Sequence, residues 1–249
     1  MTHVHVHDER VVLNSPVLVE GLPGLGLVGK IAADHLIDEL EMRYYASVEC
    51  PGLPPVAAYR DGGYEALPPV RIYADEERNL LALKSDVPIP RGVRSEFAGC
   101  VSQFVVDRNA LPVYVSGRPP ADDGEDRGEL AVSGIATGTA ARLLQEADIS
   151  PPTADGVWRG PTGALLDAAR SRGLDAVGLA VEVAPNEPNP RAACRMLEKG
   201  IAPIAGFDAH AEVLQECAAE IREQRRGLAE AMEAGGDESS RAEPLRMYQ

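Results

Sequence analysis

The chain has 249 residues, 45% of them hydrophobic, which is enough to build a sizeable core in one large or two small domains. Its net charge of −15 argues against binding to the nucleic-acid backbone or to an anionic membrane surface, because both partners require positive charge. No run of 18 apolar residues is present, and the first eight residues lack the features of a secretory signal. We therefore expect a cytoplasmic protein without a membrane segment.

Strand-like and helix-like patterns alternate along the chain. Strands are expected at 11–20 with a break at Pro16, 43–50, 54–60, 66–73, 79–87, 111–117, 129–138 and 174–183. Asp61-Gly62-Gly63 is a hairpin signal between the third and fourth of these segments, and the last segment is apolar enough for a parallel core strand. Helices are expected at 27–40, 95–108, 139–147, 162–173 and 208–234, and the segment 184–200 is expected to be a proline-rich turn followed by a helix. This order predicts an α/β fold with a mixed sheet sandwiched by helices.

The C-terminal part of the sequence divides into a helix and a tail. One narrow apolar stripe runs along 208–234 and could pack on the domain or on a second subunit; it comprises Leu214, Cys217, Ile221, Leu228 and Met232. Residues 235–249 begin with Gly-Gly, are rich in charged and small residues, and contain Pro244, which is a composition typical of disorder. We predict one domain over 1–234 and a flexible tail over 235–249.

The charged residues have an unusual balance. Asp and Glu number 39 against 24 Lys and Arg, and the only lysines are Lys30, Lys84 and Lys199. Such a composition is typical of proteins from a high-salt cytoplasm, where ions screen the repulsion between surface carboxylates. We predict a protein of a halophilic archaeon, with a merely acidic protein as the alternative.

Neither the cysteines nor the histidines form a recognisable metal motif. The cysteines contain no CxxC pair and are expected to be small buried hydrophobes in a reducing compartment: Cys50, Cys100, Cys194 and Cys217. Alternation along a strand would place three histidines on one face, where they could hold a metal weakly, although a terminal His-x-His run is more often only solvated: His3, His5 and His7. We predict no metal and no cofactor.

A glycine-rich turn at Gly24, Gly26 and Gly29 fits the pattern GxGxxG between a strand and a helix. With Glu49 twenty residues further on, it has the spacing of a dinucleotide-binding motif. However, no helix is expected after Glu49, so the unit cannot be completed. We favour a packing role, in which the glycines permit a tight turn and close contact between helix and sheet.

Two segments resemble the proteasome assembly chaperone family, and in particular its archaeal members and the second eukaryotic chaperone. The first is 19–33, VEGLPGLGLVGKIAA, and the second is 160–166, GPTGALL. The positions that match the family motifs are Gly21, Gly24, Gly26, Gly29, Gly160, Thr162 and Gly163. The resemblance implies an α/β sandwich similar to nucleoside phosphorylases without a catalytic set, a homo-oligomer, and a partner in the α-subunits of the proteasome.

The last three residues, Met247-Tyr248-Gln249, resemble the hydrophobic–tyrosine–any-residue tag that docks proteasome activators between α-subunits. A terminal carboxylate is a distinctive group for a pocket lysine and backbone N–H groups to bind. The tyrosine offers apolar area and a hydroxyl, and the methionine fits an irregular apolar slot. We predict that these residues are the partner-binding site.

The sequence contains no GxSxG, HExxH or GxxxxGK[ST] motif. The resemblance at 19–33 and the C-terminal tail together imply a non-catalytic chaperone or adaptor of the proteasome core particle. The alternative is a small-ligand or nucleotide-binding enzyme that uses the turn from Gly24 to Gly29, with Glu182 at the end of a core strand as part of the pocket.

The acidic composition generates a prediction about salt. The free energy of unfolding should rise from low to molar KCl, because the screening length falls to about 3 Å at 1 M and most carboxylate repulsion is lost. Thermal melts across a KCl series measure this. A melting temperature that stays constant or falls with KCl would contradict the high-salt interpretation.

Overall fold

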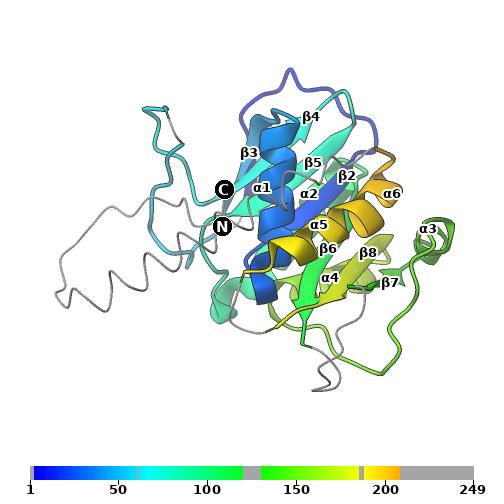
Figure 1. Ribbon diagram of the computed structural model, residues 1–249. Coiled ribbons are helices and arrows are strands. Elements are labelled where there is room, and N and C mark those ends of the chain that lie inside the picture. Colours follow the sequence, from blue (N-terminus) through cyan, green and yellow to red (C-terminus); the bar gives the residue numbers. More distant parts are fainter. Residues whose placement is uncertain (1–2, 61, 120–129, 185–187, 208–249) are drawn as a thin grey trace.

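The computed structural model describes residues 3–60, 62–119, 130–184 and 188–207, and within these ranges it forms one eight-stranded sheet between two layers of helices (Figure 1). The strands lie in the order β1-β3-β4-β5-β2-β6-β8-β7. Their bounds are β1 His3–Val6, β2 Val17–Gly21, β3 Arg43–Glu49, β4 Val70–Asp75, β5 Leu80–Ser85, β6 Leu111–Arg118, β7 Val132–Thr137 and β8 Ala176–Glu182.

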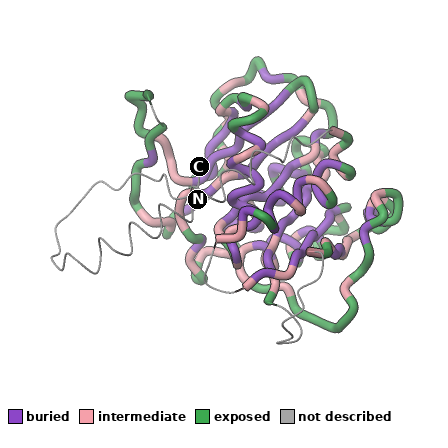
Figure 2. The backbone as a smooth tube through the Cα atoms, viewed as in Figure 1, coloured by how far each residue is buried: buried purple, intermediate pink, exposed green. Residues whose placement is uncertain are grey.

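The helical segments divide between the two faces of the sheet. Helix α1 packs against α5 on one face, and α2 packs against α4 on the other, so each face has its own buried apolar cluster (Figures 1 and 2). Their bounds are η1 Leu25–Leu27, α1 Val28–Glu39, η2 Arg91–Val93, α2 Arg94–Asp107, α3 Ala141–Glu146, α4 Gly160–Ser171, α5 Pro190–Met196, η3 Leu197–Ile201 and α6 Ala202–Ala205.

Strands β5, β2, β6 and β8 form the parallel centre of the sheet. They are nearly continuous apolar sequences, as strands covered on both faces require. The strands on either side are antiparallel, with β4, β3 and β1 on one flank and β7 on the other. The predicted mixed α/β sheet is confirmed, and the four parallel strands all end at the same edge.

Two strand predictions were wrong in part. The expected strand 11–20 begins only after Pro16, and Val12 is 76% exposed outside the sheet. The expected strand 54–60 does not form, because Pro54 and Pro55 have no N–H to donate to a ladder. The expected hairpin is reduced to a single bridge between Ala58 and Leu67 in an extended loop.

Helices α1, α2 and α4 lie within two residues of their predicted bounds. The helix predicted within 184–200 begins as α5 at Pro190, but it changes to a π-helical turn and continues as α6 beyond residue 200. Pro203 explains part of this change, because it has no N–H for the carbonyl of Lys199 four residues earlier. Among the described residues, no helix has the length and apolar character needed to cross a membrane.

Candidate functional site

Gly21 and Gly29, at the two ends of the glycine-rich segment 21–29, allow α1 to lie close against the sheet. A methyl group on Gly21 would overlap the Cβ of Ala33 in α1. A methyl group on Gly29 would lie 3.2 Å from the carbonyl oxygen of Glu20 and 3.3 Å from that of Val115. At both positions the absence of a side chain permits close contact between helix and sheet.

Between these glycines, the turn folds back over the carboxyl ends of β6 and β8. Gly26 has φ of +65°, and a methyl group there would lie 2.9 Å from Val183. The carbonyl oxygen of Gly26 accepts a hydrogen bond from the backbone N–H of Asn189 at 2.8 Å. A methyl group on Gly117 would overlap the carbonyl of Leu25. Gly26 therefore faces protein atoms, whereas a dinucleotide motif would turn this glycine toward the pyrophosphate.

Glu49 is not brought to the glycine turn. It lies at the end of β3, and β4 and β5 separate this strand from β2. Its carboxylate is exposed and lies 3.5 Å from Nε2 of His3. Glu49 is therefore not placed to bind a ribose at the glycine turn, which argues against the nucleotide hypothesis.

Glu20 is a functional candidate that the sequence analysis missed. Its side chain is completely buried, and Oε1 accepts a hydrogen bond from the N–H of Leu22 at 2.8 Å. Its Oε2 accepts bonds from the N–H of Val115 at 3.0 Å and from the hydroxyl of Thr162 at 3.2 Å. The two sequence segments that resemble the chaperone family therefore meet at this carboxyl group. The available signal was an acidic residue inside an otherwise apolar strand.

Burial raises the pKa of Glu20 from 4.5 to about 7, because the apolar interior disfavours the charged form. The hydrogen bonds from Leu22, Val115 and Thr162 work in the opposite direction without cancelling the effect of burial. The carboxyl group therefore exchanges its proton close to neutral pH.

The other positions of the second segment shape the start of α4. Gly160 has φ of +73°, and a methyl group on Gly163 would lie 2.5 Å from the carbonyl oxygen of Trp158. Thr162 is buried in the first turn of the helix, where it reaches Glu20. Gly24 and Gly160 both have room for a methyl group, since the nearest atom is 4.0 Å away at Gly24 and no atom of the described residues lies within 4 Å at Gly160.

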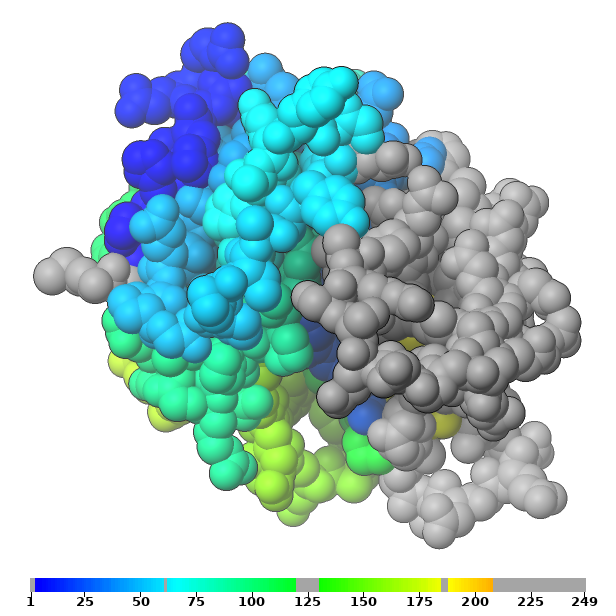
Figure 3. All heavy atoms as spheres, turned by 90° about the vertical axis from the view of Figure 1, so that its left-hand side faces the viewer, coloured from blue at the N-terminus to red at the C-terminus, as the bar shows by residue number. Residues whose placement is uncertain are grey.

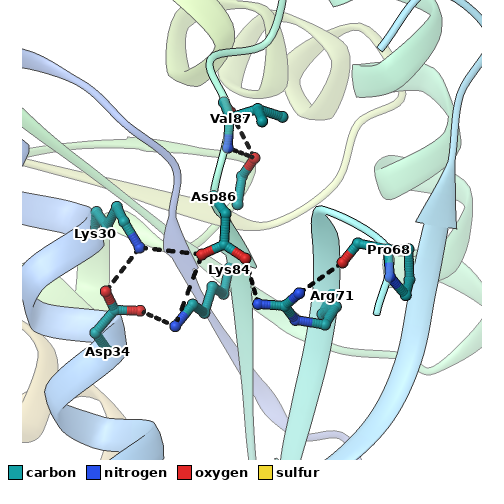
Figure 4. A network of polar contacts seen from close by, with 8 residues as sticks. Lys30, Asp34, Pro68, Arg71, Lys84, Asp86 and Val87 are labelled. Atoms are coloured by element: carbon teal, nitrogen blue, oxygen red, sulfur yellow. Dashed lines mark hydrogen bonds and ion pairs between the residues drawn. The ribbon is translucent and has the colours of Figure 1, made fainter. Parts of the chain in front are cut away.

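A buried network of charges joins α1 to β4 and β5 (Figure 4). Nζ of Lys30 lies 2.7 Å from Asp34, and Nζ of Lys84 lies 2.9 Å from the second oxygen of Asp34. Asp86 forms ion pairs with Arg71 and with both lysines. Two of the three lysines in the chain are therefore used in the interior.

The pairing determines the charge state of this network. Burial lowers the pKa of Lys84, but the charge of Asp34, a hydrogen bond to it and the charge of Asp86 outweigh burial and leave the pKa raised. Arg71 also donates to the carbonyl oxygen of Pro68 at 2.7 Å. The charged groups pair with one another, while Nε of Arg71 is buried without a hydrogen-bond partner among the described residues. The ion pairs fasten α1 to the strands.

Glu182 and the cysteines are further residues that the sequence analysis singled out. Glu182 pairs with Arg118 at 2.7 Å, across the ends of β8 and β6. Cys50 and Cys194 are buried as expected, and Cys100 is half-buried. In the described ranges, no group of three or more His, Cys, Asp or Glu side chains is arranged to hold a metal ion. Met247, Tyr248 and Gln249, the stripe over 208–234 and the tail lie outside the described residues.

Comparison with known proteins identifies the family. A model described as the PAC2 family matches residues 18–229. The chain belongs to the PAC2 family. An uncharacterized protein of Methanocaldococcus jannaschii is 29% identical over 194 residues, covering 78% of this PAC2 protein and 77% of that relative.

Solved structures agree with the family assignment. Pyrococcus furiosus PbaA, described as an archaeal homolog of proteasome-assembly chaperone, superposes with a TM-score of 0.78 at 26% identity. The match covers 94% of this PAC2 protein and 99% of PbaA. PbaB of the same organism has the same fold, with a TM-score of 0.72 at 24% identity over 92% of this chain and 98% of PbaB. The resemblance inferred from the sequence is confirmed.

The close approach of α1 to the sheet of this PAC2 protein can be tested at two glycines. Gly21→Ala should lower the free energy of unfolding by about 3 kcal/mol, because the added methyl group overlaps Ala33. The matched control Gly24→Ala should change it by less than about 0.5 kcal/mol, since that position has room. Urea denaturation measures both, and equal effects would contradict the packing role of Gly21.

The buried carboxyl group predicts a pH dependence. Between pH 4.5 and about 7 the folded protein keeps a proton on Glu20 that the unfolded chain has released. The contribution of Glu20 to the free energy of unfolding is therefore largest below pH 4.5 and falls as the pH rises to 7, by about 3 kcal/mol in total.

Glu20→Gln removes this titration. Any change that the amide itself causes in the free energy of unfolding does not vary with pH. The stability of the wild type minus that of the variant should fall between pH 5 and 7.5 and level off above, measured by urea denaturation at each pH. A difference that stays constant across this range would show that Glu20 does not titrate there.

Proposed function

We propose that this PAC2 protein is a non-catalytic chaperone or adaptor of the proteasome that binds α-subunits of the core particle through Met247, Tyr248 and Gln249. The observation that carries the proposal is the match to PbaA, which is described as a homolog of proteasome-assembly chaperone and aligns over nearly the whole of both chains. The two sequence segments that resemble the chaperone family support it.

The interior of the protein favours binding over catalysis. The glycine turn contacts Val183 and Asn189, and the carboxyl group of Glu20 is enclosed by Leu22, Val115 and Thr162. The charged groups that lie near the carboxyl ends of β2 and β5 pair with one another. These groups hold the body together, so we place the partner contact at the C-terminal residues.

The tail suits a docking role through its length and chemistry. Residues 235–249 span at most about 50 Å when fully extended, which would carry the tag away from a body ending at 234. The terminal carboxylate accepts charge-assisted hydrogen bonds, which are stronger than neutral ones. We extend the proposal to a homo-oligomer in the cytoplasm, since several tails would bind several α-subunits at once.

The C-terminal tag can be tested by deletion. Removal of Met247–Gln249, or Tyr248→Ala, should abolish binding to the core particle of the same organism, measured by surface plasmon resonance in high salt. The melting temperature should stay unchanged, because residues of a polar, glycine-containing tail contribute little to a core. Val12→Ala, at a position 76% exposed on the body, is the control that should bind normally.

Addition of one residue after Gln249 distinguishes the contribution of the terminal carboxylate to docking from that of the side chains. Docking should weaken although every original side chain remains, because the terminal carboxylate is displaced. Unchanged affinity of the deleted protein would instead place the contact on the body. Saturable nucleotide binding by calorimetry, without binding to the core particle, would support the enzyme alternative.

A further inference from the structure

Three histidines lie on one face of the edge strand β1. The strand pairs antiparallel with β3, so that His3 lies opposite Glu49 and His5 opposite Ser47. The alternation of a strand places His3, His5 and His7 on the same side, and all three are exposed. Figure 3 shows the N-terminal residues in blue on the surface of the molecule.

The rings of His5 and His7 are close enough to share an ion. Their centroids are 4.6 Å apart, and the rings are at 80° to one another. Two imidazoles bound to one metal ion at about 2.0–2.1 Å have centroids about 4.5–5 Å apart, depending on the angle at the metal. Pairing with β3 therefore holds these two side chains at a separation that suits chelation.

The ring of His7 is further held in position by its neighbours. Its Nε2 lies 2.9 Å from the hydroxyl of Ser47, which is 1% exposed, and the ring packs against Tyr44 at 4.9 Å. In metal sites, the second nitrogen of a ligating histidine commonly makes such a hydrogen bond, which fixes the ring and the tautomer. The contact with Ser47 leaves Nδ1 of His7 as the nitrogen for an ion.

We propose that His5 and His7 form a two-histidine chelate for a divalent transition-metal ion, with water in the other coordination positions. Imidazole nitrogens suit Ni²⁺, Cu²⁺ and Zn²⁺, whereas Mg²⁺ and Ca²⁺ prefer oxygen ligands. The net charge of −15 attracts cations to the protein. His3 lies beside Glu49, at 3.5 Å, and is not assigned as a ligand.

Calorimetric titration of the full chain with NiCl₂ and, separately, ZnCl₂ at pH 7.5 tests the site. The wild type should bind one ion per chain. His5→Gln and His7→Gln should each weaken binding by more than about tenfold, since even the loss of an outer partner of a metal site costs about 10–100-fold. His3→Gln, from the same face of the same strand, is the matched control and should bind as the wild type does.

Ser47 provides a test of positioning. Ser47→Ala should weaken binding, and Ser47→Thr should restore it, because only threonine keeps the hydroxyl. The ion should also raise the melting temperature of the wild type, reversibly with EDTA, and leave that of His5→Gln unchanged, because it binds the folded strand.

Three results would each overturn the proposal. One is unchanged affinity in both His5→Gln and His7→Gln, and another is an equal loss in the His3→Gln control. The third is equally tight binding by the chain unfolded in urea, which would show that strand geometry contributes nothing.

Discussion

The close contact between α1 and strand β2 is the constraint on which the rest of the structure depends. Side chains on both elements would normally hold a helix away from a sheet. Gly21 has none opposite Ala33, and Gly29 has none opposite the carbonyl oxygens of Glu20 and Val115. The α1 axis can therefore approach the backbone of the strands. Lys30 and Asp34, in the first two turns of the helix, are therefore brought to the carboxyl end of β5, where Lys84 lies in the strand and Asp86 follows it.

This approach explains why so many charged groups are tolerated in the interior. A buried ion is costly unless it is paired and hydrogen-bonded, and each member of the Lys30–Asp34–Lys84–Asp86 group contacts at least two others or a further cation. The burial of Glu20 is tolerated for a different reason. Hydrogen-bond donors surround its carboxyl group in place of a cation, and its pKa is raised. The family motifs therefore describe how the body is built, and the proposed partner site lies elsewhere.

Local patterns predicted those elements whose formation depends mainly on neighbouring residues. The helical spacing of Val28, Ile31 and Leu36 located α1, and the apolar segment 174–183 located β8. The same reasoning failed at 54–60, where β-type residues surround two prolines and find no partner strand beyond one bridge. It also assigned a possible ligand role to Glu49, which the strand order places far from the glycine turn.

The sequence by itself determined the α/β class, the family and the glycine turn, because composition, periodicity and short motifs are properties of contiguous residues. Only the tertiary structure decided that Glu20 meets Thr162 across 142 positions, that Lys30 and Lys84 share Asp34, and that His7 is held by Ser47. These contacts depend on the strand order and on how closely α1 approaches the sheet. A pattern read along one chain does not contain distances between segments that are remote in sequence, and the chemistry of a site depends on those distances.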